Sequence, residues 1–253
     1  MLSIVIITKN EAHIIGNTLR SLQGVSDDII IVDSGSTDDT VAICKKFNAT
    51  VIETTWNGYG PNKNKGINTA KNDWILSLDA DEAIDEVLKE EILKLKPENE
   101  NVVYKLTYRN FFCGKRIRFG VWAGDEHIRI FNRKKIKWDE AEVHEDLVLP
   151  ANVKVQSLKG KVLHYTVNNI TEYSDKTIAY ARANAKKYYG RGKKTGFIKL
   201  YLAPAFNFLQ HYIFRLGFLD GWEGYLICKT NAWYTFMKYV FLRELNKKGG
   251  KAV

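Results

Sequence analysis

Three short apolar runs near the start of the chain each end in a cluster of polar side chains. The clusters are Thr8-Lys9-Asn10-Glu11, Asp33-Ser34-Gly35-Ser36 and Asp79-Ala80-Asp81-Glu82. Stretches with helical apolar spacing separate the runs, which predicts an α/β layer with a largely parallel sheet. Parallel strands place their carboxyl ends at one edge of the sheet, where ligands of open α/β sheets bind. We therefore expect the three clusters to converge on one site.

The same patterns predict the positions of the first elements. We expect strands at residues 2–8, 29–32, 51–52 and 74–78, and helices after Ile14, from Thr37 to Phe47 and from Glu86 to about Leu95. Asp85 can cap the last of these helices and Pro97 can stop it. The polar stretch Asn57 to Asn64 is expected to be a loop. No GxGxxG or GxxxxGK[ST] follows the first run, which argues against a dinucleotide enzyme or a P-loop NTPase.

Charge and aromatic content divide the chain into two parts. Residues 1–169 carry a net charge of −1, whereas residues 170–253 hold 15 basic and 5 acidic residues together with 18 of the 31 aromatic residues. A basic, aromatic segment favours an anionic partner, either lipid head groups or nucleic acid. We exclude nucleic acid because no recognition motif appears and the apolar content is high for a solvated groove.

The apolar stretch at residues 198–219 is not a membrane span, because Lys199, Pro204 and Arg215 interrupt it and a span needs about 20 apolar residues. Basic, aromatic stretches lie on both sides of it, which favours amphipathic helices in a membrane interface. The alternative is a helical cap packed on the rest of the chain or on a second subunit, so a homo-oligomer is left open. Together with the absence of a secretory leader, this predicts a cytoplasmic protein peripheral to the inner face of the membrane.

Asp79 and Asp81 are spaced to face the same way at a strand end. One or two carboxylates plus the oxygens of a phosphate ligand are what Mg²⁺ or Mn²⁺ prefers, so the pair predicts a cation site. The alternative is an acidic turn that caps the next helix.

Three more residues are candidates for binding a phosphorylated ligand. Asp33 could accept hydrogen bonds from a base N–H or a ribose hydroxyl, or could cap the helix that follows. Lys63 could contact a phosphate or a base edge, or could be a solvated loop lysine. Arg129 could clamp a phosphate, or could be a paired surface charge.

The stretch Val143-His144-Glu145-Asp146 supplies a general-base candidate. Glu145 or Asp146 could take the proton from an attacking hydroxyl. His144 could be a base, a diphosphate contact or a metal ligand. The alternative is an acidic turn at the surface.

Taken together, these motifs resemble those of family 2 glycosyltransferases. Residues 2–11, 31–40 and 74–82 are similar to the three signatures of that family. Residues 62–64, 143–145 and 217–221 are similar to segments of the branch that includes bacterial lipopolysaccharide-core and related surface-polysaccharide glycosyltransferases. The resemblance covers nearly the whole chain.

The resemblance implies a GT-A fold, Rossmann-like with a mostly parallel sheet between helices, at residues 1–169. The nucleotide-sugar half would be residues 1–100 and the acceptor half 101–169, with a helical, amphipathic extension at 170–253. It also implies an inverting, Mg²⁺- or Mn²⁺-dependent transfer from a nucleotide-sugar donor, by default a UDP-sugar, to a hydroxyl of a lipid-linked or lipopolysaccharide-core glycan.

The resemblance also assigns roles to the candidate residues. Asp81 would be the direct metal ligand, with Asp79 as a further one; His144 stays a metal-ligand candidate from its residue type alone. Glu145 would be the base, although other branches use the Asp of such a pair, here Asp146. Thr8, Glu11, Asp33 and Lys63 fall at nucleotide positions of the family. With Asn10, Asp79 and Arg129 from the residue patterns above, they form the expected donor-binding set. Two alternatives are a catalytically silent scaffold that binds nucleotide sugars or lipids, and a synthase of another surface polysaccharide.

Overall fold

The computed structural model describes residues 1–97, 99–140 and 146–249. The chain forms two compact units, and each consists of two separate stretches of sequence. The first unit is Met1–Arg109 with Gly124–His164, and the second is Asn110–Ala123 with Tyr165–Val253. Two strands, β6 (Val102–Phe112) and β12 (Val162–Val167), contribute residues to both units.

Four parallel strands form the first half of the sheet, in the order β3–β2–β1–β4. They are β1 (Leu2–Thr8), β2 (Ile29–Asp33), β3 (Thr50–Glu53) and β4 (Trp74–Asp79). Most side chains of β1, β2 and β4 are buried, as expected where helices cover both faces of a parallel sheet. Thr8 pairs with Asp33, and Ile7 pairs with Asp79. The predicted strands are confirmed, and the three polar clusters follow neighbouring strand ends.

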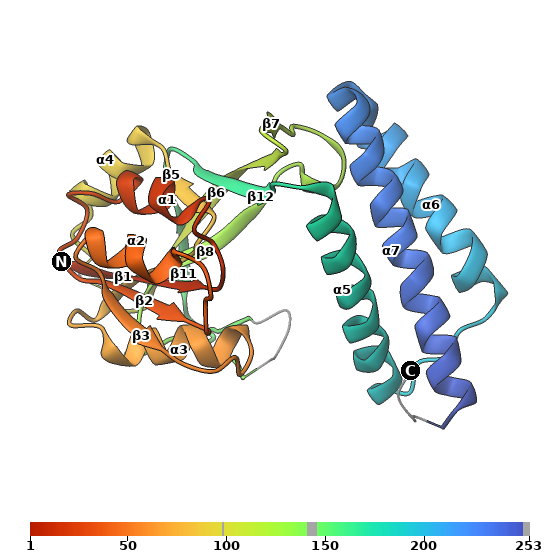
Figure 1. Ribbon diagram of the computed structural model, residues 1–253, viewed down its shortest axis with the longest axis horizontal. Coiled ribbons are helices and arrows are strands. Elements are labelled where there is room, and N and C mark those ends of the chain that lie inside the picture. The colour runs from red at the N-terminus through yellow and green to blue at the C-terminus, as the bar shows by residue number, and fades with distance from the viewer. Residues whose placement is uncertain (98, 141–145, 250–253) are drawn as a thin grey trace. The chain divides into compact units, whose positions relative to one another are not determined.

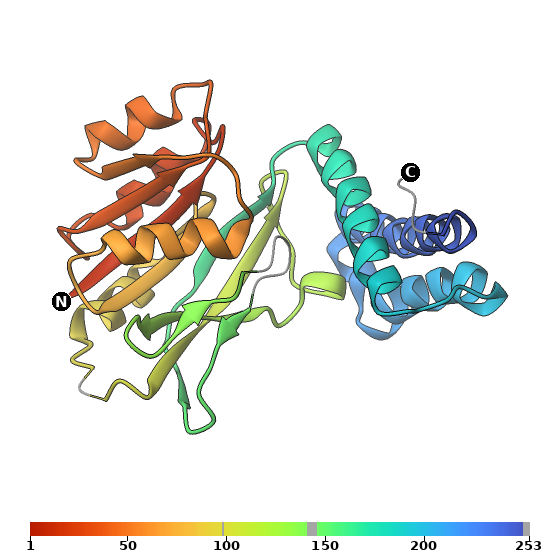
Figure 2. The same cartoon turned by 90° about the horizontal axis from the view of Figure 1, so that it is seen from below.

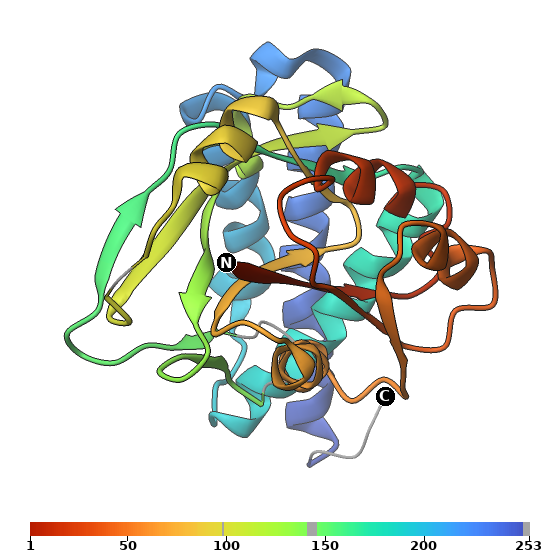
Figure 3. The same ribbon diagram turned by 90° about the vertical axis from the view of Figure 1, so that its left-hand side faces the viewer.

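Helices cover the two faces of this parallel half (Figures 1 and 3). On one face pack α1 (Ile15–Ser21), α2 (Thr40–Lys46) and α4 (Glu86–Lys94), and on the other packs α3 (Tyr59–Thr69). Asp85 caps α4 as predicted, because its Oδ1 accepts a hydrogen bond from the Leu88 N–H. Helix α2 begins at Thr40 and not at Thr37. Thr37 and Asp38 instead bond the loop after β1: the Thr37 N–H donates to Asn10 Oδ1, and Asp38 Oδ2 accepts from the Ala12 N–H.

The prediction of a loop from Asn57 to Asn64 is wrong, because most of this stretch belongs to α3 (Figure 2). Pro61 lies in the first turn, where a missing N–H breaks no helical hydrogen bond. Gly66 lets α3 approach the sheet closely: a Cβ at this position would lie 2.4 Å from Val5 Cγ1 and 2.9 Å from Val32 Cγ2. The buried residues of α3 are mostly glycine and polar, with Ile67 as the one large apolar side chain among them, so the helix has no clear apolar periodicity.

The second half of the sheet is mostly antiparallel. β8 (Glu126–Asn132) pairs with β4 and β6, and β12 pairs with β5 (Glu82–Ile84). The remaining elements of this half are β7 (Lys115–Arg116), η1 (Gly120–Trp122), β9 (Lys137–Trp138), β10 (Leu147–Val148) and β11 (Lys154–Ser157). The chain therefore has the predicted α/β fold, with an antiparallel part added to its parallel half.

The second unit contains the C-terminal helices, which confirms the predicted helical extension (Figure 1). Its two long helices, α5 (Ile170–Gly190) and α7 (Gly221–Lys247), pack against each other around Ala181, Ala185 and Leu242. Between them lie η2 (Ile198–Leu202), α6 (Ala203–Leu209), η3 (Gln210–Phe214) and η4 (Gly217–Asp220). Within the described residues, no helix has the length and apolar content that crossing a membrane requires.

Candidate functional site

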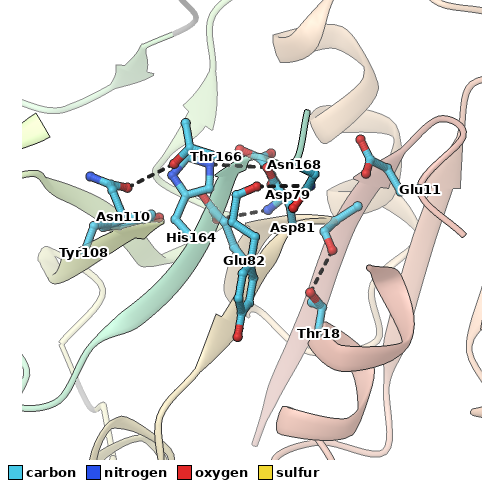
Figure 4. Close-up of polar contacts among 12 residues, drawn as sticks. Glu11, Thr18, Asp79, Asp81, Glu82, Tyr108, Asn110, His164, Thr166 and Asn168 are labelled. Carbon is cyan, nitrogen blue, oxygen red and sulfur yellow. Dashed lines mark hydrogen bonds and ion pairs between the residues drawn. The ribbon is translucent and has the colours of Figure 1, made fainter. Parts of the chain in front are cut away.

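The loop from Asp79 to Glu82 connects β4 to β5 and is held in place from both sides (Figure 4). Thr18 of α1 donates its hydroxyl to the Ala80 carbonyl at 2.7 Å. The Asp79 N–H donates to Glu82 Oε2 at 3.0 Å. These bonds fix the backbone of the loop, so the directions of the Asp79 and Asp81 carboxylates are also set.

Two basic side chains neutralise Asp79. Lys63 Nζ lies 3.1 Å from Asp79 Oδ1, and Arg129 Nη2 lies 3.3 Å from Oδ2. The Lys63 side chain is only 1% exposed, and its ammonium also lies 4.5 Å from the centre of the Trp138 ring. Burial raises the pKa of Asp79, but Lys63 and Arg129 outweigh it and hold that pKa well below its usual range. Asp79 is therefore ionised at neutral pH, with its charge balanced by protein groups.

Arg129, on β8, is the centre of a buried polar network. It lies 2.7 Å from Glu82 Oε1 and donates through Nε to the Tyr108 hydroxyl of β6. Burial raises the pKa of Glu82 despite the nearby guanidinium, and burial also raises the pKa of Tyr108. The guanidinium is thus directed at carboxylates of the chain itself. We expected Arg129 to clamp a phosphate of the donor, but this geometry favours a role in positioning Asp79 and Glu82.

Asp81 has a different environment from Asp79. Its Oδ2 lies 3.4 Å from Nε2 of His164, and both side chains are 23% exposed. His164 reaches this position because β12 pairs with β5, where it lies opposite Glu82. Burial lowers the pKa of His164, but the Asp81 carboxylate outweighs it and raises that pKa to about 9.

The other predicted donor-binding residues lie at the ends of β1 and β2. The buried Thr8 hydroxyl has no hydrogen-bond partner among the described residues. Asp33 accepts hydrogen bonds from the Gly35 and Ser36 N–H groups at 3.0 and 2.9 Å, which stabilises its own turn. Asn10 has a positive φ of 56° and accepts from the Thr37 N–H at 2.8 Å.

Glu11 ties the end of β1 to α1 and α2. Its N–H donates to Thr40 Oγ1 at 2.8 Å, and its carbonyl accepts from the first N–H groups of α1. Its carboxylate lies 3.7 Å from His13 Nε2. Glu11 and Asn10 thus shape the loop that borders the β1 strand end.

The general-base candidates lie only partly within the described residues. His144 and Glu145 fall outside them. Asp146 is exposed, and its N–H donates to Asp139 Oδ1 at 3.2 Å. The pairing of β9 with β10 places Leu147 opposite Trp138. Asn64 of α3 donates to the Trp138 carbonyl and accepts from the Trp138 N–H.

His164, Glu82 and Tyr108 are site residues that sequence reasoning missed. Glu82 was visible as part of the polar cluster, but nothing local showed that it would be buried against Arg129. His164 lies in an apolar strand more than eighty positions from Asp81, so only the register of β12 on β5 reveals the pair.

The residues around Asp81 are compatible with a divalent cation. In the described part of the chain, no group of three or more His, Cys, Asp or Glu side chains is arranged to hold a metal ion. Mg²⁺ and Mn²⁺ are commonly held by one or two protein ligands, with phosphate and water oxygens completing the coordination. Asp81 with His164 offers such a pair, because Asp79 is already neutralised. Of these two ligands, the carboxylate is the type that both Mg²⁺ and Mn²⁺ prefer.

Comparisons with known proteins agree with these features. The sequence model described as glycosyl transferase family 2 matches residues 3–146. An uncharacterized glycosyltransferase of Rickettsia felis is 30% identical over 255 residues, which cover 96% of this chain and 89% of the relative. The lipopolysaccharide core biosynthesis glycosyltransferase LpsC of Rhizobium meliloti is 29% identical over 244 residues, covering 93% and 89%.

A solved structure with a similar arrangement is S. aureus TarS 1-349 in complex with UDP-GlcNAc. It has a TM-score of 0.45 and 14% sequence identity, and the match covers 98% of this chain and 92% of that one.

Proposed function

Because the chain belongs to glycosyltransferase family 2, and is therefore a glycosyltransferase, we propose that it transfers a sugar from a nucleotide-sugar donor to a glycan hydroxyl. The transfer inverts the anomeric carbon and depends on Mg²⁺ or Mn²⁺. UDP is the favoured nucleotide. The acceptor is a lipid-linked or lipopolysaccharide-core glycan, an assignment that the similarity to LpsC supports.

The observation that carries this proposal is the contrast between Asp79 and Asp81. Lys63 and Arg129 satisfy Asp79, whereas Asp81 faces the His164 imidazole at the edge of the same loop. Asp81 with His164 is therefore the pair that would hold the cation. A bound divalent cation would neutralise charge on the departing nucleotide diphosphate.

The other residues of the chain bind and orient. Thr8, whose buried hydroxyl has no hydrogen-bond partner among the described residues, can bond the nucleotide, and the Asp33 turn follows the strand paired beside it. Lys63 and Arg129 fix the Asp79 carboxylate, so the loop carries Asp81 in one position. Glu145 or Asp146 takes the proton from the acceptor hydroxyl as it attacks from the face opposite the leaving group.

A binding experiment with two matched variants tests the metal assignment. We expect UDP with Mn²⁺ to raise the melting temperature of the wild type, since a ligand at a hundredfold excess over its dissociation constant adds about 2.7 kcal/mol. Asp81→Asn should lose this shift. Asp73→Asn is the control, because Asp73 pairs with Lys134 at the surface and contacts no part of the site.

A full metal-dependent shift in Asp81→Asn would refute the role of Asp81. The stereochemistry is tested separately, by proton NMR of the anomeric centre of the product. A retained configuration would refute the inverting mechanism. Glu145→Gln and Asp146→Asn identify the base when product formation and the UDP–Mn²⁺ melting shift are both measured. Only loss of the base should abolish transfer while leaving nucleotide binding intact.

A further inference from the structure

An apolar stripe runs along the helical stretch formed by η2, α6 and η3 in the second unit. Exposed residues occur there in pairs at positions 197–198, 201–202, 205–206, 209–210 and 213–214. All of them except Ala205 and Gln210 carry large apolar side chains. The most exposed are Phe214 at 77% and Phe197 at 71%, and Phe206 is 63% exposed. This set of positions is the apolar stripe.

Apart from the exposed Lys199, the positions between these pairs are less exposed and pack toward α7. Asn207 accepts a hydrogen bond from Asn231 at 2.8 Å, and the ring of Phe208 lies against Tyr225. The helical stretch thus turns a mixture of apolar and polar residues toward its neighbour, including the buried Leu200, and still presents large apolar side chains to solvent. Burial within the unit alone would select a polar outer side.

The π-helical turns keep the apolar stripe on one side of the helix. An α-helix has 3.6 residues per turn, so a stripe with a period of four would rotate by about 40° at each step, or about 160° over four steps. η2 and η3 are π-helical and contain more residues per turn. They offset the drift of α6 between them. Since π-turns are rare and often mark functional positions, the alignment indicates contact with one flat surface.

Basic side chains lie at both ends of the apolar stripe. Lys193 and Lys199 are exposed near its start, Arg215 is exposed just after its end, and residues 197–214 contain no Asp or Glu. The next acidic residues along the chain are already engaged: Asp220 accepts from two backbone N–H groups, and Glu223 pairs with Lys115. The charge around the stripe is therefore positive.

Two exposed tryptophans on α7 add to this chemistry. Trp222 and Trp233 are 66% and 51% exposed and lie eleven residues apart, which places them on the same side of the helix. Tryptophan is enriched at membrane–water interfaces, where its ring lies at the level of the head groups.

We propose that the apolar stripe docks on the surface of an anionic lipid bilayer. The apolar side chains enter the boundary between head groups and acyl chains, and the flanking basic residues bind the anionic head groups. A second copy of the chain fits less well. A symmetric dimer pairs a patch with itself, and because both ends of the stripe are basic, either orientation would bring like charges together. This inference goes beyond the proposed reaction, since it concerns what the protein binds outside its site.

Vesicle flotation of the full chain tests the proposal. We expect the wild type to float with vesicles of phosphatidylcholine and phosphatidylglycerol, to bind phosphatidylcholine alone more weakly, and to lose part of its binding in high salt. The double variant Phe206→Ser/Phe214→Ser should bind at least about tenfold more weakly. The control is Leu93→Ser on α4, which removes a 54% exposed apolar side chain from the first unit and should leave binding unchanged.

A second variant separates the two kinds of contact. Lys193→Gln/Lys199→Gln should reduce the preference for anionic vesicles by about fivefold per lysine and leave the weak binding to neutral vesicles intact. Both lysines lie outside the proposed reaction site, and hydrolysis of the sugar donor in lipid-free buffer reports on that site independently. Normal hydrolysis with lost flotation confirms the surface.

Three results would overturn the proposal. The first is a folded wild type that floats with neither kind of vesicle. The second is equal flotation of the stripe variant and the wild type. The third is a lipid-free dimer, detected by light scattering, that the stripe variant converts to a monomer; this would make the stripe a surface for self-association.

Discussion

Replacing Arg129 by Met removes the positive charge of the buried network while keeping a side chain of similar length. Arg129 lies 2.7 Å from Glu82 and 3.3 Å from Asp79, so the variant leaves the fully buried Glu82 without its counter-charge. Breaking a buried pair by removing one partner costs about 3–5 kcal/mol. For a chain of this size, that lowers the melting temperature by about 10 °C.

The pH dependence of this loss identifies its cause. Burial already raises the pKa of Glu82, and losing Arg129 raises it further. A carboxyl group with a raised folded-state pKa stabilises the fold below its unfolded pKa, and this contribution is lost as the pH rises through the folded-state value. The stability that Arg129→Met loses relative to the wild type, measured by thermal unfolding, should therefore be small near about pH 4.5 and reach its full value near about pH 8.

The double variant Arg129→Met/Glu82→Gln is the control, because it removes both charges. It should recover more than half of the lost stability, since Asp79 keeps Lys63 as a partner. A deficit below about 1 kcal/mol, or one that is the same at both pH values, would contradict this account of a buried charge pair.

Two further predictions concern stability in other parts of the chain. Asp220→Ala should lower the free energy of unfolding by about 2–4 kcal/mol, because Asp220 Oδ2 accepts from the Arg118 and Phe119 N–H groups at 2.9 and 2.8 Å. Asp220→Asn should lower it less, and equal losses measured by thermal unfolding would argue against these bonds. Without metal, the stability that His164 adds over His164→Gln should be fully present below about pH 6.5 and lost as the pH rises through about 9, because Asp81 raises the pKa of His164. A difference that stays constant from neutral to alkaline pH would show that the two groups do not interact.

The parallel half of the fold could be predicted because its signals are local. Each of β1, β2 and β4 is a continuous apolar run that ends in polar residues, and Asp85 caps α4 through a neighbour three positions away. The edge that brings Thr8, Asp33 and Asp79 together then follows from parallel pairing alone.

The parts that could not be predicted depend on contacts between distant residues. α3 packs through Gly66 against Val5 and Val32, so its helical character comes from tertiary fit and not from apolar spacing. His164 meets Asp81 only through the register of β12 on β5. The sequence left Arg129 open between a phosphate clamp and a paired surface charge, because its sequence neighbours gave no sign of its partner Glu82.

The discontinuous second unit has a consequence for how this protein could be shortened or recombined. Its packing joins Phe112 and Ile117 from one stretch of sequence with Val167 and Ile227 from the other. Truncating the chain after β12 would therefore remove Ile227 and leave Phe112 and Ile117 without part of their packing. The C-terminal helices therefore do not form a separable domain by themselves. A chimera between relatives would preserve this packing only if residues 110–123 were exchanged together with the helices.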